Sequence, residues 1–152
     1  MGSGARGMRL LTALAVGLVL LAPAASRAAD DFVVVVHPSL AGANIRRADL
    51  AAIFLKKASR WGGAGGNATP VDQSGTSAVR SAFSEAVLGM PVATAVQYWQ
   101  KQMFGANPLR PPVVKGSDAE VIAFVAETPG AVGYVSKATA LPAGVKALAV
   151  ID

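Results

Sequence analysis

The residues best suited to chemistry stand together in segment 72–80, which reads Asp-Gln-Ser-Gly-Thr-Ser-Ala-Val-Arg. The four small residues 74–77 stand between a short expected strand and an amphipathic run, which predicts a tight turn that opens a helix. The first N–H groups of a helix have no acceptor within it and lie at the positive end of the helix dipole. Such a turn favours binding of an anion. The candidate donors are the hydroxyl groups of Ser74 and Thr76 and the N–H groups of Gly75, Thr76 and Ser77.

Ordinary helix capping is the alternative for this turn, because Ser and Thr are common N-cap residues. Either Ser74 or Thr76 would then only accept a hydrogen bond from the helix backbone. Arg80 lies four residues after Thr76 on the same helical face, and helical side chains lean toward the N-terminus. Its guanidinium is then within reach of an anion at the turn; alternatively, Arg80 is solvated or pairs with Glu85. Asp72, just before the turn, completes the candidate binding set.

The residue types give little support to catalysis or to metal binding. His37, Asp72 and Ser74 suggest a catalytic triad, but the sequence has neither a G-x-S-x-G nucleophile elbow nor an S-x-x-K motif. With one histidine and no cysteine, neither a structural metal site nor thiol chemistry is expected. The glycine-rich segment 62–66 lacks the lysine of a phosphate-binding P-loop and is expected to be a connecting loop. We therefore expect a binding protein that is not an enzyme and needs no cofactor.

Residues 1–28 carry the pattern of a secretory signal peptide. Two arginines precede an apolar run at 10–21, and small residues follow up to a cleavage site after Ala28. The run is shorter than the roughly 20 residues of a membrane-spanning helix. The expected domain is then 29–152, in the periplasm of a Gram-negative envelope. Three arginines of the leader account for three of the five net positive charges, so the basicity does not indicate a nucleic-acid partner.

Strands and helices alternate along the rest of the chain, which predicts an α/β fold with one sheet covered by helices. The run DFVVVVH at 31–37 is continuously apolar, as in a strand that is buried on both faces. A loop is expected at 39–44. The other expected strands cover 69–72, 113–114, 131–135 and 145–151, and the expected helices cover 46–57, 77–88, 92–103 and 117–126.

The basic and aromatic residues are expected to have structural roles. Lys56 and Lys57 fall in the last turn of the helix expected at 46–57, where cations meet the negative end of the dipole. With Arg60 and Trp61 they form a cluster that could touch an anionic lipid or a polyanion, or a solvated helix end with Trp61 folded onto the domain. The remaining aromatic residues that we expect to pack inside are Tyr98, Trp99, Phe104 and Tyr134.

Four segments, in the same order along the chain, resemble the phosphate-binding proteins of ABC transporters, which are periplasmic binding proteins of the PstS type. These segments are 49–61 (DLAAIFLKKASRW), 72–76 (DQSGT), the pair Tyr98 and Trp99, and 128–135 (TPGAVGYV). The resemblance implies one lobe of a type II periplasmic-binding-protein-like fold, with a mixed sheet flanked by helices. It also implies that Ser74, Gly75 and Thr76 bind phosphate or a related oxyanion, and that an ABC permease is a partner.

Two features depart from the family's pattern. The family usually has an arginine two positions before the aspartate, where this chain has Pro70, and Arg80 stands at a position that is aromatic in the family. The resemblance also covers only one of the two lobes that enclose phosphate. A homodimer or another envelope protein would then have to cover the site. The alternative is an envelope interaction module that kept the lobe fold and lost tight anion binding.

Overall fold

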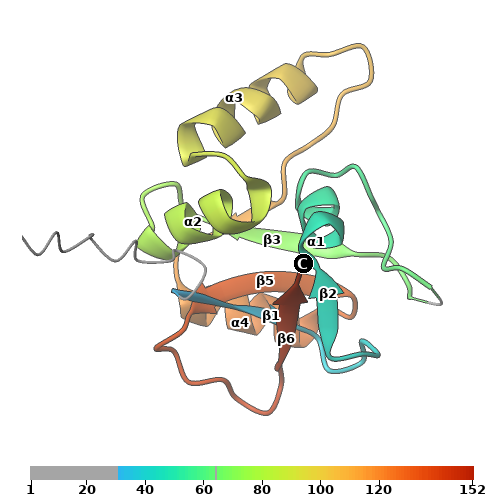
Figure 1. Ribbon diagram of the computed structural model, residues 1–152, viewed down its shortest axis with the longest axis vertical. Helices are drawn as coiled ribbons and strands as arrows, with labels where there is room; N and C mark the ends of the chain where they lie inside the picture. The colour runs from blue at the N-terminus through green and yellow to red at the C-terminus, as the bar shows by residue number, and fades with distance from the viewer. Residues whose placement is uncertain (1–30, 64) are drawn as a thin grey trace, which may run out of the picture.

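A computed structural model describes residues 31–63 and 65–152, and within them it shows one six-stranded mixed sheet flanked by helices (Figure 1). The strands are β1 (Phe32–Val36), β2 (Asn44–Arg46), β3 (Thr69–Gln73), β4 (Val113–Lys115), β5 (Ala131–Ser136) and β6 (Lys146–Ile151). The helices are α1 (Arg47–Phe54), α2 (Ala78–Phe83), the π-helix η2 (Ser84–Leu88), α3 (Val92–Met103) and α4 (Asp118–Glu127). The predicted leader at 1–28 lies outside the described residues. The predicted α/β class is confirmed.

The strand order is β2-β6-β1-β5-β3-β4. β1 runs antiparallel to β5 and β6, whereas β3 runs parallel to β5 and β4, and β2 runs parallel to β6. The carboxyl ends of β3, β4 and β5 therefore meet at one edge of the sheet, together with the start of β1. The turn that follows β3 stands at this edge.

Each face of the sheet packs against its own helices. Val34 and Val36 of β1 lie in the core under α1 and α2, and Val35 lies in the core under α4, which confirms the strand buried on both faces. In the first of these cores the ring of Phe83 stacks on that of Tyr134, with centroids 3.9 Å apart. None of the described helices is long and apolar enough to span a bilayer.

The segment 39–57 differs from its prediction in two ways. β2 begins inside the predicted loop, because its three residues pair with β6, which no local pattern indicated. The helix predicted to reach Lys57 ends at Phe54, and Lys56 takes a left-handed φ of 57°. The N–H groups of Lys57 and Ala58 both return to the carbonyl of Ala52, which closes the helix. The two lysines therefore do not lie in the last helical turn, and that prediction was wrong.

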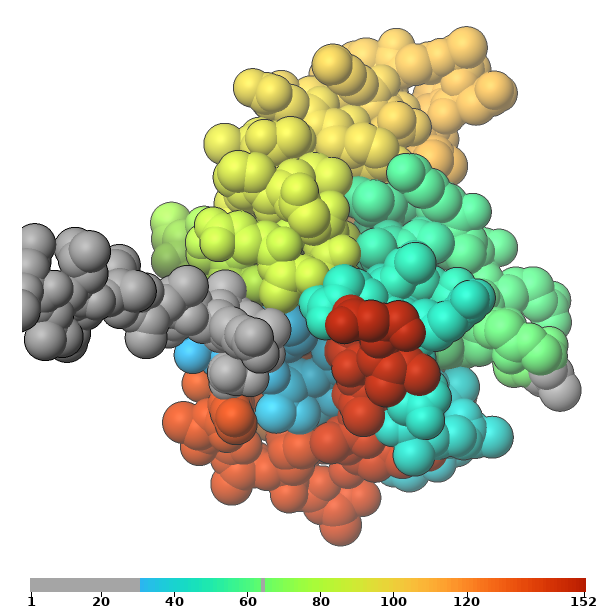
Figure 2. Space-filling view, viewed as in Figure 1, coloured from blue at the N-terminus to red at the C-terminus, as the bar shows by residue number. Residues whose placement is uncertain are grey.

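The predicted helix at 77–88 is present as α2 followed directly by η2, and it ends at Gly89, which has a left-handed φ of 68°. α3 then leads away from the sheet, and it stands out with the loop after it in yellow and orange (Figures 1 and 2). Only Ala95 and Trp99 of α3 are buried. The hydroxyl of Tyr98 donates to the carbonyl of Leu55 at 2.8 Å and ties α3 to the end of α1.

Candidate functional site

The candidate turn at 74–77 closes at the carboxyl end of β3. The N–H of Ser74 donates to the carbonyl of Lys115 in β4, and the N–H of Ser77 donates to the carbonyl of Ser74. The hydroxyl oxygens of Ser74 and Thr76 lie 3.1 Å apart, and Gly75 and Thr76 are exposed. Both hydroxyl groups therefore face the same region of solvent-accessible space at the edge of the sheet.

The backbone donors of the turn agree with the prediction in part. Among the described residues, the N–H groups of Gly75, Thr76 and Ala78 have no hydrogen-bond acceptor. The N–H of Ser77 is taken by the turn itself, so the expectation that it points to an anion was wrong. Ala78 was not predicted to donate, although its place at the first helical position is the signal that would have found it.

Ser77 is the residue that caps α2. Its hydroxyl oxygen accepts from the N–H of Arg80 at 3.4 Å, and its hydroxyl donates to Oε1 of Gln73 at 3.2 Å. Capping was expected at Ser74 or Thr76 if the turn had no ligand. Because Ser77 provides the cap, the hydroxyl groups of Ser74 and Thr76 have only each other as partners within the described part of the chain.

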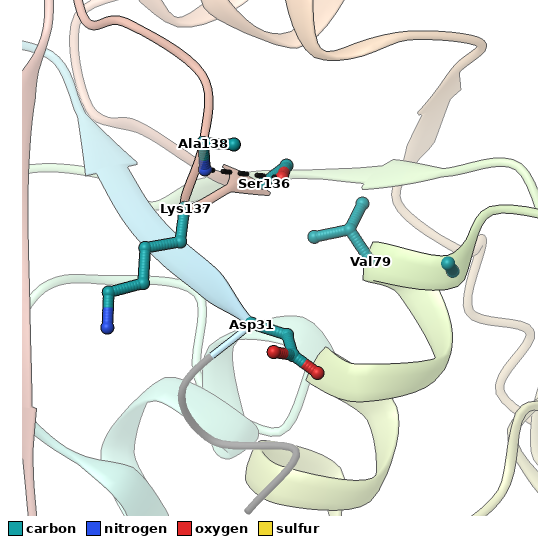
Figure 3. Close-up of a pocket in the computed structure, with 6 residues that line it drawn as sticks. Asp31, Val79, Ser136, Lys137 and Ala138 are labelled. Atoms are coloured by element: carbon teal, nitrogen blue, oxygen red, sulfur yellow. Dashed lines mark hydrogen bonds between the residues drawn. The ribbon is translucent and has the colours of Figure 1, made fainter. Parts of the chain in front are cut away.

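A cavity of about 660 Å³ borders the start of α2 at the same edge of the sheet (Figure 3). It is lined by Asp31, Ala78, Val79, Ser136, Lys137 and Ala138. The N–H of Lys137 donates to the carbonyl of Asp31, and in Figure 3 the Lys137 side chain extends away from Val79. The walls carry one acidic and one basic side chain, so their charges favour neither sign of ligand. No sequence pattern indicated this cavity, since three distant segments form it.

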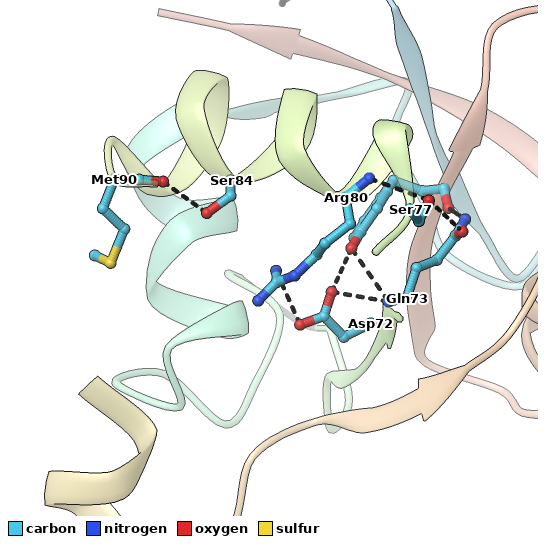
Figure 4. A network of polar contacts seen from close by, with 7 residues as sticks. Asp72, Gln73, Ser77, Arg80, Ser84 and Met90 are labelled. Atoms are coloured by element: carbon cyan, nitrogen blue, oxygen red, sulfur yellow. Dashed lines mark hydrogen bonds and ion pairs between the residues drawn. The ribbon is translucent and has the colours of Figure 1, made fainter. Parts of the chain in front are cut away.

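Arg80 lies beneath the helix rather than over the turn. It is 4% exposed, and its Nη1 lies 2.9 Å from Oδ2 of Asp72, which is 5% exposed. In Figure 4 its side chain runs from α2 toward Asp72 and away from Ser77. The expectation that Arg80 reaches back to an anion at the turn was wrong, and so were its alternatives of a solvated side chain or a pair with Glu85. The long side chain instead follows the buried face of α2 to the nearest buried carboxylate.

The carboxylate of Asp72 is fully engaged. Oδ1 accepts from the hydroxyl of Tyr134 and from the N–H of Gln73, and Oδ2 faces Arg80. Burial raises the pKa of Asp72, and the charge of Arg80 and the two hydrogen bonds oppose that rise. Burial and the neighbouring carboxylate raise the pKa of Tyr134, which keeps its hydroxyl a donor. Nη1 of Arg80 makes the ion pair but no aligned hydrogen bond to any described residue.

Gln73 links this pair to the other face of the sheet. Its Nε2 donates to Oδ1 of Asp118 at 2.7 Å and to the carbonyl of Tyr134 at 2.9 Å. Oδ2 of Asp118 accepts from the hydroxyl of Thr139 and from the N–H of Ser136. These contacts fix the end of β3 to α4 and β5, so the turn stands on a rigid support. The sequence indicated Asp118 only as part of a helix start.

The other candidate clusters lie away from the turn. His37 lies at the far end of β1, where its Nδ1 contacts the hydroxyl of Ser39 at 2.7 Å, so it does not meet Asp72 and Ser74. Trp61 is 7% exposed and donates its indole N–H to the carbonyl of Gly130, as expected for a packed side chain. Within 31–63 and 65–152, no group of three or more acidic or histidine side chains could hold a metal ion.

The mixed sheet with helices on its two faces agrees with one family. A sequence profile for the PBP superfamily domain matches residues 25–150. The chain belongs to this family. A search of curated protein sequences found no match to this chain.

Solved structures share the fold of this PBP superfamily domain. An ABC-type phosphate transport receptor from Vibrio cholerae superimposes with a TM-score of 0.61 at 20% identity, over 80% of this chain and 46% of the receptor. PstS from Borrelia burgdorferi superimposes with a TM-score of 0.59 at 20% identity, over 80% of this chain and 47% of PstS. The third structure comes from Clostridium perfringens and was solved with bound phosphate; it is assigned as a phosphate ABC transporter substrate-binding protein. It superimposes with a TM-score of 0.60 at 18% identity, over 80% of this chain and 45% of that protein. The chain thus spans less than half the length of each.

Proposed function

We propose that this domain binds phosphate or a related tetrahedral oxyanion at the turn 74–77. The observation that carries the proposal is the set of free donors there. The N–H groups of Gly75, Thr76 and Ala78 and the hydroxyl groups of Ser74 and Thr76 lack other acceptors among the described residues, and the turn is exposed. Donors without acceptors at the start of a helix suit an anion. The fold shared with phosphate receptors supports the choice of phosphate.

Asp72 and Arg80 serve this site as positioning residues in the proposal. Their charges largely offset each other, so the pair adds little net attraction for an anion. Its contacts with Tyr134 and the backbone of Gln73 hold the last residues of β3 in place. In this arrangement Arg80 pairs with Asp72 from the helix, and it does not replace at the anion site the arginine that the resemblance implies at the position of Pro70.

Weak binding is expected from this half-site. An anion on an open turn keeps much of its hydration, and charge-assisted hydrogen bonds are then weaker than in an enclosed cleft. Two or three such bonds correspond to a dissociation constant of about 1 mM, or about −4 kcal/mol. A homodimer or an ABC permease that covers the turn would raise the affinity, and size-exclusion chromatography with and without phosphate tests the homodimer.

Calorimetric titration of residues 29–152 with phosphate, sulfate and nitrate tests the proposal. Phosphate should release or absorb measurable heat, and both Ser74→Ala and Thr76→Val should weaken binding because each removes a hydroxyl donor. Ser59→Ala is the matched control, and it should bind as the wild type does. Ser59 is exposed, and its carbonyl accepts from the N–H of Ala68 just before β3, at the opposite end of that strand from the turn. Absence of heat at millimolar phosphate, or an equal loss in Ser59→Ala, would contradict the proposal.

The second candidate function is an envelope interaction module that kept the lobe fold. The exposed apolar side chains on α3 and the loop after it favour it. Export is part of both proposals, on the strength of the leader pattern at 1–28 and of the transport receptors among the structural neighbours. Neither proposal assigns a catalytic step to the chain.

A further inference from the structure

The segment 101–110, which we call the tip, exposes three large apolar side chains where α3 ends. Phe104 is 86% exposed, Met103 is 40% exposed and Leu109 is 37% exposed. The expectation that Phe104 packs inside was therefore wrong. In Figures 1 and 2 this part of the chain stands at the far end of the protrusion formed by α3 and the loop after it.

The tip has a fixed shape. The N–H of Phe104 donates to the carbonyl of Gln100 at 3.3 Å, and the N–H of Leu109 donates to the carbonyl of Gln102 at 3.1 Å. The second bond brings the two ends of the loop together. The buried side chain of Trp99, one turn earlier, anchors the helix to the rest of the domain. The apolar side chains are thus presented by a closed loop at the end of an anchored helix.

The tip has two charged residues, Lys101 and Arg110, which stand at its two ends and are both positive. Between Glu85 and Asp118 the sequence contains no acidic residue. A partner that accepts these apolar side chains must therefore also be acidic, because like charges would oppose the contact.

We propose that the tip inserts into an anionic phospholipid surface. Phe and Leu side chains are stable at the boundary between headgroups and acyl chains, and each basic residue near an anionic surface adds further attraction. A lipid surface fits better than an acidic protein because the tip is convex and small. A stable protein interface needs about 800 Å² from each partner, more than three side chains on a loop provide. The proposal is independent of the anion site.

Co-sedimentation of residues 29–152 with lipid vesicles tests the proposal. This stretch holds the described sheet and both of its cores. It should bind vesicles of phosphatidylcholine that contain phosphatidylglycerol, and not vesicles of phosphatidylcholine alone. Phe104→Ser should weaken binding about tenfold, because a large apolar side chain no longer leaves water. The double change Lys101→Glu and Arg110→Glu should also weaken it about tenfold.

Two matched controls separate the tip from the rest of the surface. Ile151→Ser removes a side chain that is 44% exposed at the end of β6, and Lys57→Glu reverses an exposed charge beside Trp61. Both should bind as the wild type does. If Lys57→Glu loses binding while the tip variants keep it, the lipid contact lies in the other basic cluster and the proposal fails. Failure of the wild type to bind anionic vesicles also overturns it.

A fluorescent variant reports insertion directly. Phe104→Trp keeps an apolar side chain at the tip, and its emission should shift to shorter wavelength with anionic vesicles and be quenched by brominated lipid. Emission that stays unchanged while the protein sediments with vesicles would show that another surface makes the contact. A loss of self-association in Phe104→Ser with no change in vesicle binding would assign the tip to a second copy of the chain instead.

Discussion

At the scale of single residues, the pair of Asp72 and Arg80 determines how the turn is held. Both side chains are almost completely buried, and a buried charge that loses its partner costs far more than an exposed one. Arg80→Met should therefore lower the free energy of unfolding by about 3–5 kcal/mol. In the double variant with Asp72→Asn the loss should be smaller, because an amide oxygen can still accept from Tyr134.

Urea denaturation followed by tryptophan fluorescence measures these effects. Arg46→Met is the control, because Arg46 pairs with Asp49 at 2.8 Å with both side chains more than half exposed. It should cost less than about 1 kcal/mol. Equal losses for Arg80→Met and Arg46→Met would mean that the buried pair contributes no more to the free energy of unfolding than the exposed pair does.

Asp118 should make stability depend on pH. Burial acts to raise the pKa of Asp118, but hydrogen bonds from Thr139, Gln73 and Ser136 outweigh it, and the net pKa lies below the ordinary value of 3.8. A carboxyl with a lowered pKa in the folded state stabilises the fold above the unfolded value and loses this effect as pH falls through the folded value. The difference in urea midpoint between wild type and Asp118→Asn should shrink below pH 3.8. A difference that grows with acidity would contradict this.

The sequence was enough to predict which residues form the turn, but it did not predict which side chains from other parts of the chain contact them. Ser74 and Thr76 are close along the chain, so local pattern was enough to bring their hydroxyl groups together. The direction of Arg80 depends on how α2 sits on the sheet, and the carboxylate it meets is engaged by Tyr134, 62 residues further on. No local pattern contains that contact.

At the scale of elements, Ser77 and Thr76 should separate capping from binding. Ser77→Ala should lower stability by about 1 kcal/mol, because it removes the cap of α2. Thr76→Val should leave stability nearly unchanged, since its hydroxyl contacts only Ser74 among the described residues. Thermal unfolding measures both. If Thr76→Val lowered stability more than Ser77→Ala does, Thr76 would have a structural role, and the binding proposal would be weakened.

The packing of α4 on β5 depends on Gly133. A methyl group there would lie 2.6 Å from Cγ1 of Val121 and 2.8 Å from Cγ1 of Val71, and both valines are fully buried. Gly133→Ala should therefore cost about 1–3 kcal/mol in urea unfolding. Gly75→Ala is the control, because its nearest neighbour, Cγ1 of Val92, is 3.7 Å away. Similar stabilities for the two variants would show that α4 moves away without cost.

Elements with a strong local signal were predicted and the others were not. β1 follows from its continuous apolar run, and α4 follows from the capping box, in which Ser117 accepts from the N–H of Glu120 at 3.3 Å. β2 and the end of α1 depend on pairing with β6 and on backbone bonds to Ala52. Such contacts leave no periodic trace in the sequence.

At the scale of the whole molecule, the sheet gathers the ends of β3, β4 and β5 at one edge and places the turn there. The alternation of strands and helices, together with the resemblance to phosphate receptors, was enough to predict this architecture. The cavity beside Asp31 and the exposed tip were not predictable, because both depend on which surfaces the packing leaves uncovered. The chain spans less than half of each solved receptor.

The central claim is that an anion binds at the turn 74–77, and amide NMR tests it most directly. In a titration of ¹⁵N-labelled residues 29–152 with phosphate, the amide signals of Gly75, Thr76 and Ala78 should shift in a saturable way. Sodium chloride at matched ionic strength should not move them. No shift at millimolar phosphate, or shifts centred on Asp31 and Lys137 at the cavity instead, would contradict the account.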